Sequence, residues 1–146
     1  MPEKETLRRA RADKRAGKSP STQAGEFVRE EMHHVREGKH GARSTKQAIA
    51  IGLSKARRSG VKLAPPRGGK ASTRRSAAAA TRASRTRSRP SATRSRGVRR
   101  ALKREGHRAA SRKALSRQAK TAARRRSAAS RRASARKAAR TRRQHA

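Results

Sequence analysis

Cysteine, tryptophan and tyrosine are absent from this chain, and Phe27 is its only aromatic residue. Without cysteine there is no disulfide framework, no thiol nucleophile and no thiolate metal site. Acidic residues are scarce as well, with 8 Asp and Glu against 45 Lys and Arg among 146 residues, and only 30% of the chain is hydrophobic. A composition this charged and this poor in apolar residues predicts that no sizeable core can form.

Long apolar runs are missing too. No segment approaches the roughly 20 apolar residues of a membrane span. The charged start, Met1-Pro2-Glu3-Lys4-Glu5, is not followed by the apolar stretch of a signal peptide. We therefore expect neither a membrane span nor a leader, and by default a cytoplasmic, nucleoid-associated location.

Charge divides the chain into unequal parts. Residues 1–63 hold 16 bases and 7 acids, whereas residues 64–146 hold 29 bases and the single acid Glu105. The change falls at Ala64-Pro65-Pro66-Arg67-Gly68-Gly69, which neither helix nor strand should continue through. The composition predicts a helical head over 1–63, a Pro/Gly/Ser-rich basic linker over 64–97 and an Arg/Ala-rich basic tail over 98–146.

The head has three helical patterns, so we expect a small all-α fold of two to three short helices. A charged, marginal helix should span Glu3–Ala16, a second should run from a Ser19 cap to Gly38, and a third from Ser44 or Thr45 to Gly60. The second and third could pack as a helical hairpin. The predicted core residues are Phe27, Val28, Met32, Val35, Ile49 and Leu53.

The tail is low in complexity, and we expect it to be largely disordered with latent helicity. Its stretch from Ala71 to Gly97 predicts an extended linker. Between about Val98 and Arg143, alanine and arginine favour helix while like charges oppose it, so folding on contact with a polyanion is expected. The predicted nucleic-acid-binding residues are Arg74, Arg75, Arg99, Arg100, Lys103, Arg104, Arg112, Lys113, Arg124, Arg125, Arg126, Arg131, Arg132, Arg136, Lys137, Arg140, Arg142 and Arg143.

Histidines and glutamates of the head raise the question of a metal or acid–base site. On a helix, Glu30 would share a face with His34, and His33 with Glu37, which is adequate spacing for one weak divalent contact; His40 lies nearby. An exposed, salt-bridged helix face is the favoured interpretation, so no metal and no cofactor are predicted. The serines lack an Asp/His arrangement for nucleophilic catalysis, and we predict that the protein is not an enzyme.

The head segments Ser19–Glu31 and Val35–Arg58 resemble a bacterial domain-of-unknown-function family. Its members are small basic proteins often labelled DNA-binding, and the resemblance covers about residues 1–66. The pieces Ala101–Gly106 and Lys113–Ala119 are similar to tails in the same group. In composition, the tail also resembles those of linker histones and bacterial histone-like proteins, with arginine in place of their predominant lysine.

A net charge of +37 predicts a polyanionic partner. Each base that meets a phosphate releases condensed counterions, and the absence of aromatic stacking residues argues against single-strand platforms. We therefore predict non-sequence-specific binding of duplex DNA in a histone-like or nucleoid-associated architectural role. An RNA-binding or ribosome-associated protein is the main alternative. A polycationic membrane-active protein is the third, although the tail lacks the apolar face of interfacial helices. The head could self-associate or bind a protein partner.

Overall fold

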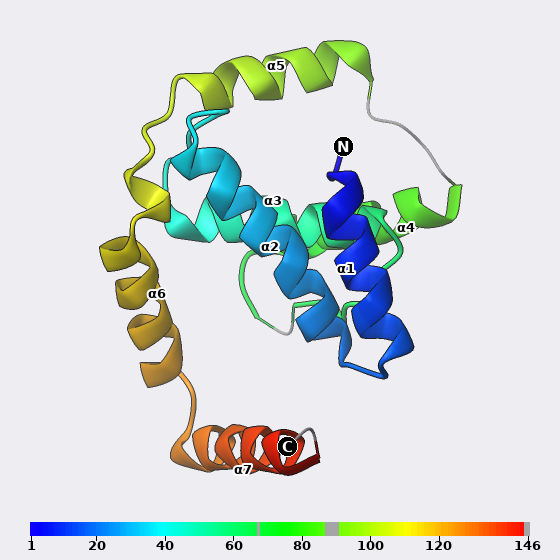
Figure 1. Ribbon diagram of the computed structural model, residues 1–146. Helices are drawn as coiled ribbons and strands as arrows, with labels where there is room; N and C mark the ends of the chain where they lie inside the picture. The colour runs from blue at the N-terminus through cyan, green and yellow to red at the C-terminus, as the bar shows by residue number, and fades with distance from the viewer. Residues whose placement is uncertain (67, 87–90, 145–146) are drawn as a thin grey trace. The chain divides into compact units, whose positions relative to one another are not determined.

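The computed structural model describes residues 1–66, 68–86 and 91–144. Over these residues the chain forms seven α-helices and one short 3-10 helix, with no strand (Figure 1). Contacts divide it into unit 1, residues 1–111, and unit 2, residues 112–146. The helical prediction is confirmed. The prediction of a short head followed by a disordered tail is wrong, because helices continue to Gln144.

Local sequence signals explain the first three helices, α1 (Lys4–Arg15), α2 (Pro20–Arg36) and α3 (Thr45–Arg58). The Ser19 hydroxyl accepts a hydrogen bond from the Thr22 amide at 3.4 Å, and the Ser44 hydroxyl accepts one from the Gln47 amide at 3.2 Å. Side chains of this type satisfy amides that the first turn of a helix leaves free. After α2, Gly38 adopts a φ of 73°, a left-handed conformation that ends helices and favours glycine.

Small residues let α2 pack closely against α3, while α1 lies alongside α2 (Figure 1). At Gly52 of α3, a side-chain carbon would come within 2.7 Å of the Val28 Cα. Ala48 and Ala56 share the helix face of Gly52 and are fully buried. The stripe on which α3 packs is therefore built from alanine and glycine. Of the six predicted core residues, Phe27, Met32 and Val35 are buried and Val28, Ile49 and Leu53 are partly buried.

Helix α4 (Ala71–Thr86) occupies most of the stretch for which composition predicts an extended linker, so the extended conformation is wrong there. This helix packs against α3, and its Ala80 is only 1% exposed. Alanine is the best helix former, and its small side chain lets a polar helix approach a neighbour closely. Residues 87–90 of the predicted linker lie outside the described residues.

Hydrogen bonds attach α5 (Ala92–Lys103) and η1 (Arg108–Ala110) to α2, to α3 and to the loop between them. The Gly41 amide donates to the Leu102 carbonyl at 2.9 Å, and the Thr45 hydroxyl donates to the Ala109 carbonyl at 2.6 Å. The Arg36 Nε donates to the Ala110 carbonyl at 2.8 Å. The polar segment after α5 is therefore an ordered part of unit 1.

Unit 2 contains α6 (Arg112–Arg124) and α7 (Ala128–Gln144), where the composition predicts chain that folds only on binding a polyanion. These helices form without a polyanion because the repulsion between their charges is small compared with their helix propensity. Repulsion between like charges three or four residues apart costs only about 0.2 to 0.5 kcal/mol per pair. Alanine, arginine and lysine dominate both helices and rank among the best helix formers. Their propensities offset the repulsion, so helix does not require a bound polyanion.

Candidate functional site

Helix α6 carries a basic face. Lys113, Arg117, Lys120 and Arg124 follow at intervals of four, three and four residues, which places their side chains on one side of a helix. These four bases line an open surface depression together with Ser116 and Thr121. Leu115 belongs to the opposite side of α6. We call the four bases the α6 basic face.

Helix α5 in unit 1 has a second basic face. Arg96, Arg99, Arg100, Lys103 and Arg104 follow at helical spacing and line an open depression of their own. The segment that follows is held by a hydrogen bond from the Ala42 amide to the Gly106 carbonyl at 3.0 Å. This face therefore projects from an ordered helix whose C-terminal end is attached to the core of unit 1.

All eighteen predicted nucleic-acid-binding residues are exposed, and they are distributed over α4, α5, α6, α7 and the residues that follow these helices. They do not form one continuous stripe within either unit. Sequence reasoning missed Arg96, Arg117 and Lys120, which complete the two basic faces. Their helical spacing is visible in the sequence, but it places side chains on one face only where the tail is helical.

Among the described residues, no ion pair joins an acid to the bases of α4 to α7. Every ion pair in the described part of the chain is formed by residues between Glu3 and Lys55. Unit 2 has 14 Lys and Arg and no Asp or Glu in its sequence. Its cations therefore face solvent without an opposite side-chain charge of their own unit.

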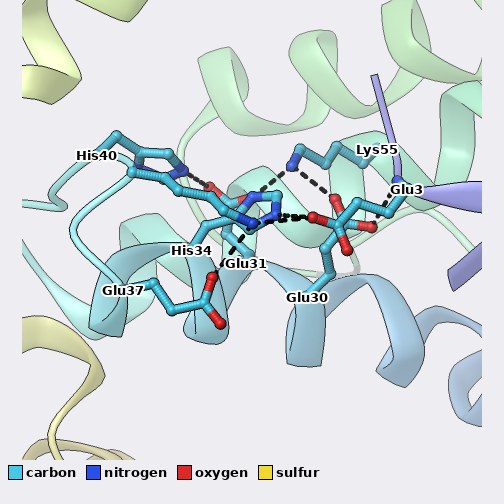
Figure 2. Close-up of polar contacts among 8 residues, drawn as sticks. Glu3, Glu30, Glu31, His34, Glu37, His40 and Lys55 are labelled. Atoms are coloured by element: carbon cyan, nitrogen blue, oxygen red, sulfur yellow. Dashed lines mark hydrogen bonds and ion pairs between the residues drawn. The ribbon is translucent and has the colours of Figure 1, made fainter. Parts of the chain in front are cut away.

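Acidic residues gather instead in a polar cluster between α1, α2, α3 and the loop after α2 (Figure 2). Glu31 is fully buried, and its carboxylate lies 2.7 Å from the Lys55 ammonium and 3.0 Å from the His40 Nε2. The His34 Nε2 lies 2.8 Å from a Glu3 oxygen. We call the following eight residues the Glu–His cluster: Glu3, Glu30, Glu31, His34, Glu37, Lys39, His40 and Lys55.

Electrostatic pairing within the Glu–His cluster shifts the pKa values of Glu3 and Lys55 toward their ionised forms. The hydrogen bond with His34, helped by Lys39, lowers the pKa of Glu3 to about 2. Burial alone would lower the pKa of Lys55, but its contacts with Glu31 and Glu30 outweigh burial and raise that pKa above its ordinary value. These contacts connect α3 to α2 and the start of α1 to the end of α2.

Three members of the cluster could hold a metal ion. Glu31, His34 and His40 each direct one ligand atom so that all three atoms lie within 4.8 Å of one another. This grouping differs from the pairs suggested by helical spacing, Glu30 with His34 and His33 with Glu37. Glu30 and Glu31 are buried, and not on an exposed face as predicted, because α3 and α1 cover this side of α2.

A protein-family model matches residues 11–67, and the family that it describes is DUF6496, a family of unknown function. The matched region runs from α1 to just beyond α3, so it includes every member of the Glu–His cluster except Glu3 and none of the helices that follow α3. No curated protein and no solved structure matches the chain. No comparison therefore bears on the basic helices α4 to α7.

Proposed function

We propose that this protein binds nucleic acid without sequence specificity, with duplex DNA as its main partner, by neutralising backbone phosphates with the exposed bases of α4 to α7. The observation that carries the proposal is the α6 basic face, four cations on one side of a helix in a unit with 14 bases and no acid. The positive side chains of such a surface repel one another, and a bound polyanion reduces that repulsion.

Helix geometry favours a duplex as the partner. From Lys113 to Arg124 the α6 basic face extends over twelve residues, whose eleven rises of 1.5 Å give a length of about 16 Å. Duplex DNA carries about one negative charge per 1.7 Å of its axis, so a helix of this length meets several phosphates. Arginine, which outnumbers lysine 24 to 5 after residue 63, makes bidentate contacts with phosphate oxygens. No aromatic residue follows Phe27 to stack on unpaired bases.

Phosphate contacts position a protein but do not read sequence. The basic faces therefore support an architectural, nucleoid-associated role in which DNA is neutralised and bridged. The similarity of the tail to linker-histone tails in composition agrees with this proposal. Among the described residues, every helix is too short or too polar to span a bilayer.

Salt titration of binding tests the proposal. The full-length protein is mixed with several unrelated fluorescent duplexes, and affinity is measured by anisotropy at increasing salt. The expected plots of log affinity against log salt are steep and nearly parallel, with slopes that imply on the order of ten or more neutralised phosphates. A duplex that binds a thousandfold tighter than the others at one salt concentration would contradict nonspecific binding.

A matched pair of variants locates the contact. In the first, the α6 basic face is neutralised by Lys113→Gln, Arg117→Gln, Lys120→Gln and Arg124→Gln. In the second, four exposed bases of α1 and α3 are neutralised by Arg11→Gln, Lys14→Gln, Arg15→Gln and Arg58→Gln. Both lose four charges, but only the first should reduce the slope, by about 3 to 4. Equal reductions would show that overall charge matters and the face does not.

Competitors identify the class of polyanion. Structured RNA and anionic lipid vesicles are added at matched salt to the complex with labelled duplex. Duplex DNA should compete best. If structured RNA displaces the duplex at concentrations at which unlabelled duplex does not, the RNA-binding alternative replaces the proposal. Displacement by vesicles alone would point instead to a membrane surface.

A further inference from the structure

The Glu–His cluster has a surplus of negative charge in a chain whose net charge is +37. Half of the eight acidic residues of the chain lie in it, namely Glu3, Glu30, Glu31 and Glu37. Two ammonium groups, from Lys39 and Lys55, oppose these four carboxylates. With neutral imidazoles, the cluster is therefore short of two positive charges.

The His40 ring shows where a cation would fit. Its Nδ1 lies 3.0 Å from the Gly41 carbonyl oxygen, which can only accept, so Nδ1 must carry the hydrogen. In the neutral ring, Nε2 then has a lone pair, and this lone pair faces the Glu31 carboxylate oxygen at 3.0 Å. Two lone pairs facing each other repel unless a proton or a metal ion lies between them.

The surroundings of Glu31 favour binding of a further cation. Its side chain is fully buried, one carboxylate oxygen is paired with the Lys55 ammonium at 2.7 Å, and the other lies 3.0 Å from the His40 Nε2. The oxygen paired with Lys55 is Oε2 of Glu31, and Oε1 of Glu31 faces the His40 Nε2. A fully buried carboxylate is stabilised by nearby positive charge, so a further cation at Oε1 beside His40 would stabilise Glu31.

We propose that Glu31, His34 and His40 form a zinc site with two imidazole ligands, one carboxylate ligand and an open fourth position. Two histidines and one glutamate are a ligand set that Zn²⁺ takes in proteins. In a tetrahedral site with bonds of about 2.1 Å, ligand atoms lie about 3.4 Å apart. The three ligand atoms already lie within 4.8 Å of one another, so small side-chain rotations complete the site.

Outer contacts of the kind that orient zinc ligands are also present. Histidine ligands usually donate their second ring hydrogen to a carbonyl or a carboxylate. His40 donates from Nδ1 to the Gly41 carbonyl, and a His34 bound to zinc through Nδ1 would keep its Nε2 contact with the Glu3 carboxylate at 2.8 Å. Zinc would thereby tie the loop after α2 to α2 itself. The same loop bonds the end of α5 through the Gly41 amide, so metal binding would stabilise the attachment of α5.

Zinc titration of the full chain tests the proposal in the absence of nucleic acid. Metal is first removed with a chelator, and Zn²⁺ alone is added in a calorimeter. We expect one ion per chain, with affinity at least tenfold weaker in His34→Gln and in His40→Gln. His33→Gln is the matched control, since His33 is an exposed neighbour on the same helix and lies outside the three ligands. It should bind zinc as the unmodified protein does.

A measurement on the unmodified chain covers the case in which a variant fails to fold. Ring-nitrogen NMR resonances of His34 and His40 should shift when Zn²⁺ is added, while those of His33 and His107 should not. Absence of zinc binding by the unmodified chain would overturn the site and leave a proton between His40 and Glu31. Equal zinc affinity in all three variants, or shifts spread over every histidine, would also overturn it.

Discussion

Gly52 of α3 tests how closely α2 and α3 must approach. In a helix interior, replacing glycine by alanine favours folding by about 0.5 to 1 kcal/mol. At Gly52, however, the added carbon would lie 2.7 Å from the Val28 Cα and 3.0 Å from the Phe27 carbonyl oxygen. Ordinary carbon contacts are about 3.5 to 4.0 Å, so the two helices would have to separate by up to about 1 Å.

Forcing a packed core apart costs about 1 to 3 kcal/mol, and Gly52→Ala should therefore lower the free energy of unfolding by about 1 to 2 kcal/mol. Gly25 provides the matched control, because it lies within α2 and a side-chain carbon there would meet no atom within 4 Å. Gly25→Ala should raise the free energy of unfolding by about 0.5 to 1 kcal/mol. Urea unfolding followed by circular dichroism measures both. If the two variants are stabilised equally, the close approach of α2 and α3 is wrong.

Three further perturbations address the contacts that hold unit 1 together. Lys55→Met leaves the buried carboxylates of Glu30 and Glu31 without their ammonium partner, and urea unfolding should show a loss of about 3 kcal/mol or more. Burial alone would raise the pKa of Glu30, but hydrogen bonds from the Glu3 backbone amide and from the Lys55 ammonium hold this pKa below its ordinary value of 4.5. The ionised Glu30 carboxylate therefore stabilises the fold above pH 4.5, and this stabilisation is lost as the pH falls through the lower pKa of the folded state. Acid should thus destabilise the unmodified protein more than the Glu30→Gln variant. Equal acid sensitivity of the two proteins would refute this. Thr45→Val removes the donor to the Ala109 carbonyl and should cost about 1 to 3 kcal/mol, with faster amide hydrogen exchange around η1; unchanged exchange would show that the bond does not hold this segment.

Disorder in the tail was the main wrong prediction, and its cause is specific. High net charge with low hydropathy predicts a chain that cannot bury enough apolar surface to fold. That reasoning neglects the helix propensity of alanine, arginine and lysine, which forms α6 and α7 without a large core. It also neglects packing through small side chains, by which Ala80 of α4 becomes buried.

Local sequence by itself determined where the helices of the head begin and end. The capping hydroxyls of Ser19 and Ser44 and the left-handed glycines Gly17 and Gly38 act through neighbours within a few residues, so their effect can be read from the chain. Net charge likewise follows from composition alone. The caps and glycines account for the helical head, and the net charge is the ground on which a polyanionic partner is proposed.

Only the tertiary structure decided which side of each helix is buried and which polar residues meet. Helical spacing pairs Glu30 with His34, whereas the fold brings Glu31 together with His34 and His40 and places Lys55 from α3 beside them. The path of the loop after α2 and the approach of α3 to α2 produce this arrangement. Such contacts join residues that are distant along the chain, and no local periodicity encodes them.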